Sequence, residues 1–446
     1  MRCLVFLLLG RLIGLLLGLV LLGSVARADP PKLTLPQVIE KTLAGPRSHM
    51  AAEDRAAAEA RVDEADASRL PRIKATLFGT LSPEIHCLDA ACSMTSPKNF
   101  ALRFSGLFGS AQVDVTQPLY TFGKIDHART AARAGLDAQR ALADEAAGDL
   151  AVDAARAYWG VKLARELGFM LDDGIDQIGE AVAKLADKKN MSIQDKQRVA
   201  VLLAEAKAQR ADAKQAESEA LAGLRALTGV VGADVDDETM EAVKRDVPAA
   251  APSGRRPQAI AAHAGAVAAD ELAAMQAAYY WPDLALVGSA IIAGAQGADD
   301  PPSVYANDPY NRTGAGLVVA MQWTLEPWNV AARTARARAD ARKAHALADL
   351  AQVGASFDMQ TALAETTGAH DRLAAATEGE KAARTWLAAV LQAQAIGAAE
   401  AKDLADAYIA WFQMRARWSL AIFQWNVAVV RLDRAAGEFH ASGQRR

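Results

Sequence analysis

Residues 113–135 read VDVTQPLYTFGKIDHARTAARAG, and the pattern of apolar residues changes within this stretch. Val113 and Val115 alternate with polar neighbours, which is the two-residue period of a strand with two different faces. After Gly123 the chain becomes an alanine-rich, charged run that favours helix. The same change recurs after Gln322, so the sequence predicts, twice, a strand that passes directly into a long helix.

The chain is an internal repeat whose halves are offset by about 208 residues. The corresponding anchors are Leu70 and Trp281, Gln117 and Gln322, Asp195 and Asp403, and Gly229 and Gly437. Residues 230–257 are acidic and then rich in proline and alanine, which indicates a linker. We therefore expect a first repeat at 29–229, a second at 258–437 and a tail at 438–446.

Each repeat has the same predicted order of elements: an alanine-rich helix, two strands, a very long helix and a return helix. In the first repeat the strands are expected at 72–82 and 100–119 and the helices at 125–190 and 192–228. In the second the strands are expected at 283–296 and 314–325 and the helices at 330–396 and 398–436. Each long helix would measure about 100 Å at about 1.5 Å per residue. Each repeat is therefore predicted to be a rod-like helical unit with a strand pair at one end.

Glycine and proline positions predict how these strands bend. The apolar phase of the 100–119 strand flips near Gly106, where a bulge would restore one apolar face. Pro118 can end the hydrogen-bond ladder, and Gly123 allows the chain to turn into the helix. The second junction has its proline later, at Pro327, and no glycine, so the two junctions should bend differently.

The last helix carries a heptad stripe of large apolar residues, namely Leu404, Trp411, Trp418, Trp425 and Leu432, with Tyr408, Ile422 and Val429 beside it. Such a stripe normally packs against neighbouring helices. A tryptophan platform for a ligand is the alternative, and helix packing is the expectation.

Residues 1–28 have the layout of a secretory signal peptide, with Arg2 and Arg11 before an apolar run and an A-x-A pattern at Ala26–Ala28. A short membrane anchor is the alternative.

Without this segment the chain carries 46 basic and 53 acidic residues, a net charge of −7, which argues against nucleic-acid binding. Beyond residue 28 there is no uncharged apolar stretch of about 18 residues, so only strands are expected to cross a membrane.

Cys87 and Cys92 lie in one short loop, and in an oxidising compartment we expect a disulfide between them. A metal site that includes His86 is the alternative, although no fourth ligand lies nearby.

The seven histidines are scattered, and none of the common catalytic or phosphate-binding motifs occurs. We therefore expect no enzyme activity, no metal and no cofactor.

Four strands of about ten residues can span an outer membrane when tilted, but they cannot close a barrel alone. Open strand edges are not tolerated in lipid, so oligomerisation is required if these strands enter the bilayer. Three protomers would supply twelve strands, and their helices would continue as a hollow tube.

The junction QPLYTFGKI, the turn at Asn190–Asp195, the second turn IGAAEAKDLADAY (396–408) and the closing LTG at 227–229 resemble the TolC-like outer-membrane efflux protein family. The resemblance implies a mainly α protein with a membrane β-barrel. Two tandem repeats, each a strand pair plus a long helical hairpin, would trimerise into a 12-stranded β-barrel and a periplasmic α-helical barrel.

The same resemblance implies an exit duct for tripartite efflux or type I secretion. Its implied partners are further copies of the chain, a periplasmic adaptor protein, an inner-membrane transporter of RND or ABC type, and outer-membrane lipid. The alternative is a periplasmic coiled-coil scaffold or adaptor protein, although such proteins usually carry a single helical hairpin.

Asp403 and Asp406 are three residues apart, so they share one face of the return helix. They match the acidic constriction of the TolC-like family, where a ring of carboxylates attracts cations and resists closure. An ordinary solvated acidic face is the alternative.

Gln394 and Ala399 stand where some family members have a tyrosine and an arginine, so the polar clamp of those members is not carried over. Asp195 and Gln394 are the candidates for an entrance latch. The expected adaptor-docking tips are Asn190, Met191, Ser192 and Ile193 in the first repeat and Ile396, Gly397, Ala398 and Ala399 in the second.

Overall fold

The computed structural model describes residues 31–84, 103–186, 193–251, 256–300, 310–396, 398–399 and 401–439. The expected signal peptide, Cys87, Cys92, the tip residues Asn190–Ser192 and Gly397 lie outside these ranges. No helix among the described residues is long and apolar enough to cross a membrane.

The chain divides into two compact units. The sheet unit comprises Glu53–Leu142 and Gln258–Val353, and the helical unit comprises Met1–Ala52, Ala143–Pro257 and Gly354–Arg446.

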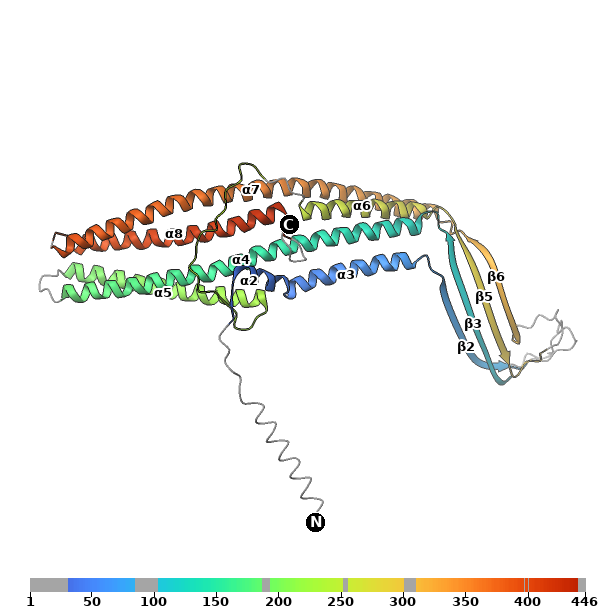
Figure 1. The fold of residues 1–446 in the computed structure, drawn as a ribbon. Helices are drawn as coiled ribbons and strands as arrows, with labels where there is room; N and C mark the ends of the chain where they lie inside the picture. The colour runs from blue at the N-terminus through green and yellow to red at the C-terminus, as the bar shows by residue number, and fades with distance from the viewer. Residues whose placement is uncertain are drawn as a thin grey trace, which may run out of the picture. The chain divides into compact units, whose positions relative to one another are not determined.

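The sheet unit contains an antiparallel sheet with the strand order β2-β3-β5-β6 (Figure 1). The strands are β2 (Arg72–Pro83), β3 (Phe104–Tyr120), β5 (Asp283–Ala295) and β6 (Arg312–Gln322). The central pairing joins β3 of the first repeat to β5 of the second. As each of β2 and β6 has one neighbour within the described sheet, the sheet ends in two open edges.

The predicted bend near Gly106 is confirmed. Leu81 pairs with Leu107 whereas Pro83 pairs with Phe104, so β3 carries one extra residue in this interval. Gly106 has a φ of +80°, which is a conformation that glycine adopts without steric cost. Together, the extra residue and the positive φ form a β-bulge, and the bulge restores one apolar face along β3.

The two strand-to-helix junctions differ, as the proline and glycine positions predict. At the first junction β3 ends at Tyr120, and Phe122 and Gly123 have φ values of 51° and 90° before α4 (Lys124–Ala186) begins. At the second, β6 ends at Gln322 and α7 (Pro327–Ala395) begins at its proline, without a positive φ in the connection. Proline suits this first helical position because its missing N–H has no intrahelical partner there.

Two shorter helices, α3 (Pro46–Ala67) and α6 (Pro257–Ala278), lie largely in the sheet unit. Asp66 of α3 pairs with Arg129 of α4. The hydrogen bond and the charge of Arg129 lower the pKa of the Asp66 carboxyl, and they outweigh the opposing effect of desolvation. His345 of α7 lies 2.7 Å from Asp270 of α6. Each shorter helix is thus joined to one of the long helices by a polar side-chain contact.

The helical unit contains two hairpins (Figure 1). The part of α4 from Ala143 on pairs with α5 (Ile193–Thr228), and the part of α7 from Gly354 on pairs with α8 (Ala401–Ala436). α2 (Leu35–Leu43) packs on α5. Of the heptad stripe, Leu404, Trp425 and Leu432 are almost fully buried, which supports helix packing for those positions. Trp411 and Trp418 are only half-buried.

The interval expected to be a linker is a packed strap over residues 230–251. It begins with β4 (Asp234–Val235), which pairs in parallel with β1 (Lys32–Leu33). The strap is then fixed to α8, because Trp425 Nε1 donates to the Val243 carbonyl at 2.8 Å and Asn426 bonds the strap backbone twice. The segment connects the two halves as expected, but these bonds make it part of the core.

Candidate membrane surface and channel entrance

The register of the sheet divides its residues into two chemically different faces. Ile73 pairs with Val115, Val115 with Gly288, and Gly288 with Leu317, which defines one row across all four strands. Because side chains alternate along a strand, the face of this row also carries Leu77, Leu81, Leu107, Val113, Ile292 and Val319. These side chains are exposed, up to 81% for Leu77, and we call this surface the apolar face.

The opposite surface, the polar face, is mostly hydrophilic on β2 and β3, where it carries Lys74, Thr76, Thr80, Ser110, Gln112, Asp114 and Thr116. On β5 and β6 it carries Ser289 and Arg312 beside the apolar residues Val287, Ile291 and Val318. Lys74 is directly opposite Asp114, and Gln112 Nε2 donates to the Asp114 carboxylate at 2.8 Å. A sheet with one apolar and one polar surface is typical of a strand set that separates lipid from a water-filled lumen.

Aromatic residues gather where the strands meet the helices. Trp281, Trp323 and Trp328 are 56%, 52% and 85% exposed. Trp323 Nε1 donates to the Tyr280 carbonyl at 3.2 Å, and Phe122 stacks on Trp281 at 5.7 Å between ring centroids. Aromatic side chains of this kind, apolar with a polar atom, concentrate at membrane–water interfaces.

At the other end of the long helices, the first turns of α8 carry the predicted acidic pair. Leu404 and Ala407 are buried against Leu387 of α7, so α8 packs on its hairpin partner through these two residues. Asp403 and Asp406 directly precede the packed residues in sequence and therefore lie on an adjacent face. Asp403 is exposed and Asp406 half-buried.

The predicted latch residues lie at the hairpin ends. Gln394 is half-buried in the last turn of α7, and Asp195 belongs to the first turn of α5, although its side chain is outside the described part. Among the tip residues, Ile193 is 80% and Ile396 82% exposed. Ala398 N–H donates to the Ala393 carbonyl at 2.8 Å, a six-residue closure found at many helix ends.

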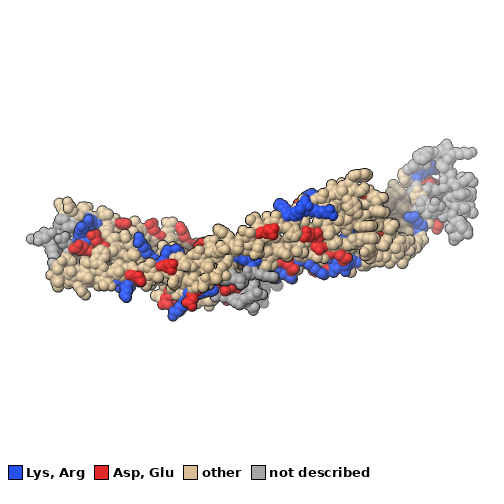
Figure 2. All heavy atoms as spheres, turned by 90° about the horizontal axis from the view of Figure 1, so that it is seen from above, with Lys and Arg blue, Asp and Glu red and all other residues tan. Residues whose placement is uncertain are grey.

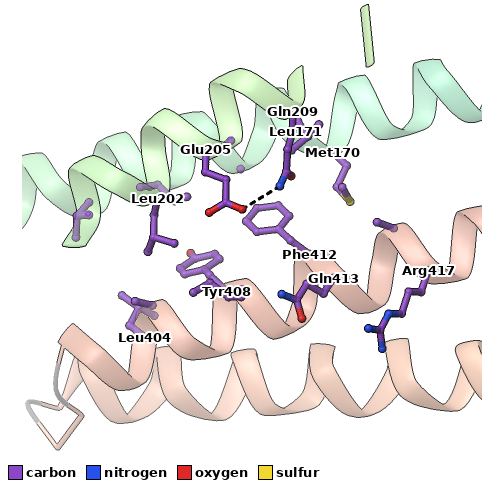
Figure 3. A pocket seen from close by; sticks show the side chains of 17 residues that line it. Met170, Leu171, Leu202, Glu205, Gln209, Leu404, Tyr408, Phe412, Gln413 and Arg417 are labelled. Atoms are coloured by element: carbon purple, nitrogen blue, oxygen red, sulfur yellow. Dashed lines mark hydrogen bonds between the residues drawn. The ribbon is translucent and has the colours of Figure 1, made fainter. Parts of the chain in front are cut away.

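A cavity of about 390 Å³ lies between the two hairpins close to the acidic pair, lined by residues of α4, α5 and α8. Figure 3 shows Tyr408 and Phe412 of α8 facing Leu171 of α4 and Leu202 of α5. Burial, with the charges of Asp173 and Glu180, raises the pKa of the Tyr408 hydroxyl. The pattern of apolar residues does not predict this cavity, and its local signal in the sequence is Gly174, an interior helical glycine against which the Phe412 ring packs.

Ion pairs that the sequence does not predict also join the hairpins. Arg415 of α8 lies 2.5 Å from Glu166 of α4 and 3.7 Å from Glu380 of α7. Farther along, Arg434 of α8 lies 2.6 Å from Glu145 of α4.

Elsewhere on the surface, charges of both signs are interspersed in the view of Figure 2. Among the described residues there is no cluster of side chains suited to hold a metal ion.

Comparisons with known proteins agree with this geometry. Residues 253–438 match the family model described as outer membrane efflux protein. No curated protein matches the chain. Several solved structures share its fold, and three outer-membrane channels are among them. The Campylobacter jejuni CmeC outer membrane channel has a TM-score of 0.76 and 14% identity, covering 94% of this chain and 92% of that one.

The open-state Neisseria gonorrhoeae MtrE outer membrane channel has a TM-score of 0.74 and 18% identity, with 93% of each chain covered. The outer-membrane channel OprN has a TM-score of 0.75 and 18% identity, covering 90% of this chain and 89% of that one. At these identities the likeness concerns the fold, and it extends over both repeats, whereas the family model covers the second.

Proposed function

We propose that the chain, whose second repeat matches the outer membrane efflux protein family and whose fold is that of outer-membrane channels, is the passive exit duct of a tripartite efflux or type I secretion system. The sheet unit would lie in the outer membrane and the long helices would extend into the periplasm. The observation that carries the proposal is the exposed apolar face of a four-stranded sheet whose other face is polar. In this arrangement the apolar face would contact lipid and the polar face would contact water.

The open edges of the sheet support a homotrimer. β2 and β6 each lack a second neighbour in the described sheet, and backbone groups left unpaired in lipid cost several kcal/mol each. Three copies joined edge to edge would give twelve antiparallel strands, an even number that falls within the range of closed membrane barrels. The polar faces would then line one shared lumen.

Asp403 and Asp406 would form the periplasmic constriction. In a trimer each residue occurs once per protomer around the axis, so the entrance would carry two rings of carboxylates. Like charges held close together repel, which favours an open entrance unless other contacts hold α8 in place. The same rings would attract cations and slow anions.

The contacts that would hold α8 are those between the hairpins. The Arg415–Glu166 ion pair and the packing of Phe412 on Gly174 both join α8 to α4. Asp195 and Gln394 remain candidates for an additional latch at the tips. The exposed Ile193 and Ile396, with Ala398 and Ala399, would meet a periplasmic adaptor that links the duct to an RND or ABC transporter.

The duct is tested by fractionation, by gel electrophoresis in mild detergent and by current recording in planar bilayers. We expect an outer-membrane trimer that conducts ions. Asp403→Asn with Asp406→Asn should change conductance and reduce cation preference, whereas Asp349→Asn, which removes an exposed carboxylate from α7, should change neither. A soluble periplasmic monomer would instead support the scaffold or adaptor function, and an unchanged current in the double variant would refute the constriction.

A further inference from the structure

An aromatic cluster lies on the polar face of the sheet, where its neighbours on β2 and β3 are the hydrophilic residues Thr76, Thr80, Ser110 and Gln112. Phe78 and Phe108 have ring centroids 5.9 Å apart at 63°, and Phe108 and Tyr310 are 5.9 Å apart at 86°. Both are edge-to-face arrangements, which aromatic pairs prefer. Phe78 is nevertheless 57% exposed, so much of its ring is left uncovered.

The register assigns this cluster to the polar face. Phe78 pairs with Ser110, and Phe108 pairs with Thr80 and Ala295, whereas the apolar face holds the alternate residues Leu77 and Gly79. A lipid contact therefore does not account for the exposed ring of Phe78. In a closed barrel the ring would project into the water-filled lumen.

The cluster lies toward the end of the strands that is remote from the long helices. β2 leaves the helical side at Arg72 and β3 returns to it at Tyr120, while Phe78 and Phe108 lie farther along both strands. With the helices in the periplasm, this end of the lumen is the outer half of the pore. Cargo would meet the cluster after the periplasmic constriction.

A cation lies in the same row as Phe78. The successive partners across the sheet are Phe78, Ser110, Ala293 and Arg312. Because neighbouring strands are about 4.8 Å apart, the backbones of Phe78 and Arg312 are separated by about 14 Å. The two residues between them have small side chains, so the row forms a shallow trough with an aromatic end and a basic end.

We propose that Phe78, Phe108 and Tyr310, with Arg312, form a cargo-contact site that favours planar aromatic anions. The ring of such a solute would stack on Phe78 and Phe108, and its anionic group would lie toward the Arg312 guanidinium at the other end of the row. Stacking on an aromatic side chain needs no particular ring substituents, so the aromatic end selects planar solutes and the basic end selects their charge. This site rests on the proposed duct, because it requires a lumen.

The test uses purified trimers in planar bilayers, with 1-naphthalenesulfonate as the anionic probe and the uncharged 1-naphthalenemethanol beside it. We expect the sulfonate to block the open-channel current more strongly than the alcohol does. Phe78→Ser should weaken the block by the sulfonate about tenfold, as expected for the loss of one stacking contact. Arg312→Gln should remove the preference for the sulfonate over the alcohol.

Phe104→Ser is the matched control. Phe104 is 55% exposed, nearly as much as Phe78, but it pairs with position 83, two residues from Leu81, on the apolar face. Its replacement should leave the block unchanged. If Phe78→Ser does not assemble, Phe78→Leu keeps an apolar side chain without a stacking ring and should weaken the block equally.

The outcomes separate the two proposals. A conducting trimer in which none of the Phe78 and Arg312 variants changes the block would overturn the aromatic site and leave the duct intact. Equal effects of the Phe78 and Phe104 variants would overturn it as well. A protein that forms no conducting trimer would overturn the duct and, with it, the site.

Discussion

The Arg415 guanidinium of α8 lies 2.5 Å from the Glu166 carboxylate of α4, which joins the second hairpin to the first. Both side chains are about three-quarters buried. Arg415 also contacts Glu380 of α7 and lies over the Trp418 ring at 4.5 Å. One side chain on the helix that carries Asp403 and Asp406 thus contacts α4, α7 and α8 itself. If α8 moves when the entrance opens, this ion pair is one of the contacts that must break.

Arg415→Gln should therefore favour the open entrance. The variant leaves the Glu166 carboxylate without its partner and weakens the hold of α4 on α8. We expect a larger mean conductance in planar bilayers. Arg431→Gln is the control, because Arg431 pairs with Glu365 within the α7–α8 hairpin at a more exposed position. An equal change in both variants would show that charge loss, and not the link between hairpins, is responsible.

Gly174→Ala tests the packing of Phe412 on α4. A methyl group at position 174 would overlap the Phe412 ring, so α8 or the ring must shift. Overpacking of this kind typically costs about 1–3 kcal/mol. We expect a lower midpoint for heat dissociation of the trimer and a larger conductance, both reversed by adding Phe412→Ala.

Gly179→Ala is the matched change, since an added methyl group there would meet nothing within 4 Å. Alanine favours helix over glycine by about 1 kcal/mol, so this variant should be neutral or stabilising. Destabilisation by both alanines would contradict the role of Phe412.

The sequence was sufficient for the elements whose pattern is local. The bulge at Gly106 and the unlike junctions at Gly123 and Pro327 follow from glycine and proline positions, and the structure confirms them. The strap was not predictable, because its bonds to Trp425 and Asn426 join residues more than 180 positions apart. A proline- and alanine-rich stretch has the same composition whether or not a helix lies beneath it.

The residues of the candidate channel entrance likewise differ in whether the sequence alone predicts them. The i, i+3 spacing of Asp403 and Asp406 is visible in the sequence, whereas the Arg415–Glu166 pair depends on how two hairpins pack. Periodicity predicts which face of a helix is apolar, but it does not identify the charged residue that will meet that face. Of the heptad stripe, Trp425 is buried as predicted, while Tyr408 is half-buried and lines the cavity.

The two faces of the sheet should respond oppositely to an added charge. Leu77→Arg places a cation on the apolar face, where arginine costs about 2–4 kcal/mol near the bilayer midplane. Thr76→Arg places the same side chain on the polar face, one residue away. We expect poor insertion and fewer heat-stable trimers for Leu77→Arg and normal assembly for Thr76→Arg. The reverse order would overturn the assignment of the faces to lipid and lumen.

The last prediction concerns acid stability and the attachment of the strap to α4. Lys162 Nζ lies 2.5 Å from Asp236 of the strap, and the Tyr158 hydroxyl donates to the same carboxylate at 2.6 Å. Burial acts to raise the pKa of the Asp236 carboxyl, but its bonds to Lys162 and Tyr158 outweigh that effect and lower it. Burial, followed by the bond to Asp236, raises the pKa of the Tyr158 hydroxyl.

A lowered folded-state pKa means that Asp236 stabilises the fold fully above its unfolded pKa of about 3.9 and loses this effect as the pH falls through the folded value. Asp236→Asn should therefore cost about 3 kcal/mol at neutral pH, because it leaves the nearly buried Lys162 ammonium without its counter-charge. The deficit should shrink below about pH 4 in thermal unfolding followed by circular dichroism. Asp237→Asn is the control, since Asp237 is 73% exposed and pairs with Lys32 at the surface, where such pairs contribute about 0–1 kcal/mol. A deficit of Asp236→Asn that stays constant from pH 7 to pH 3 would show that the carboxylate charge is not what holds the strap.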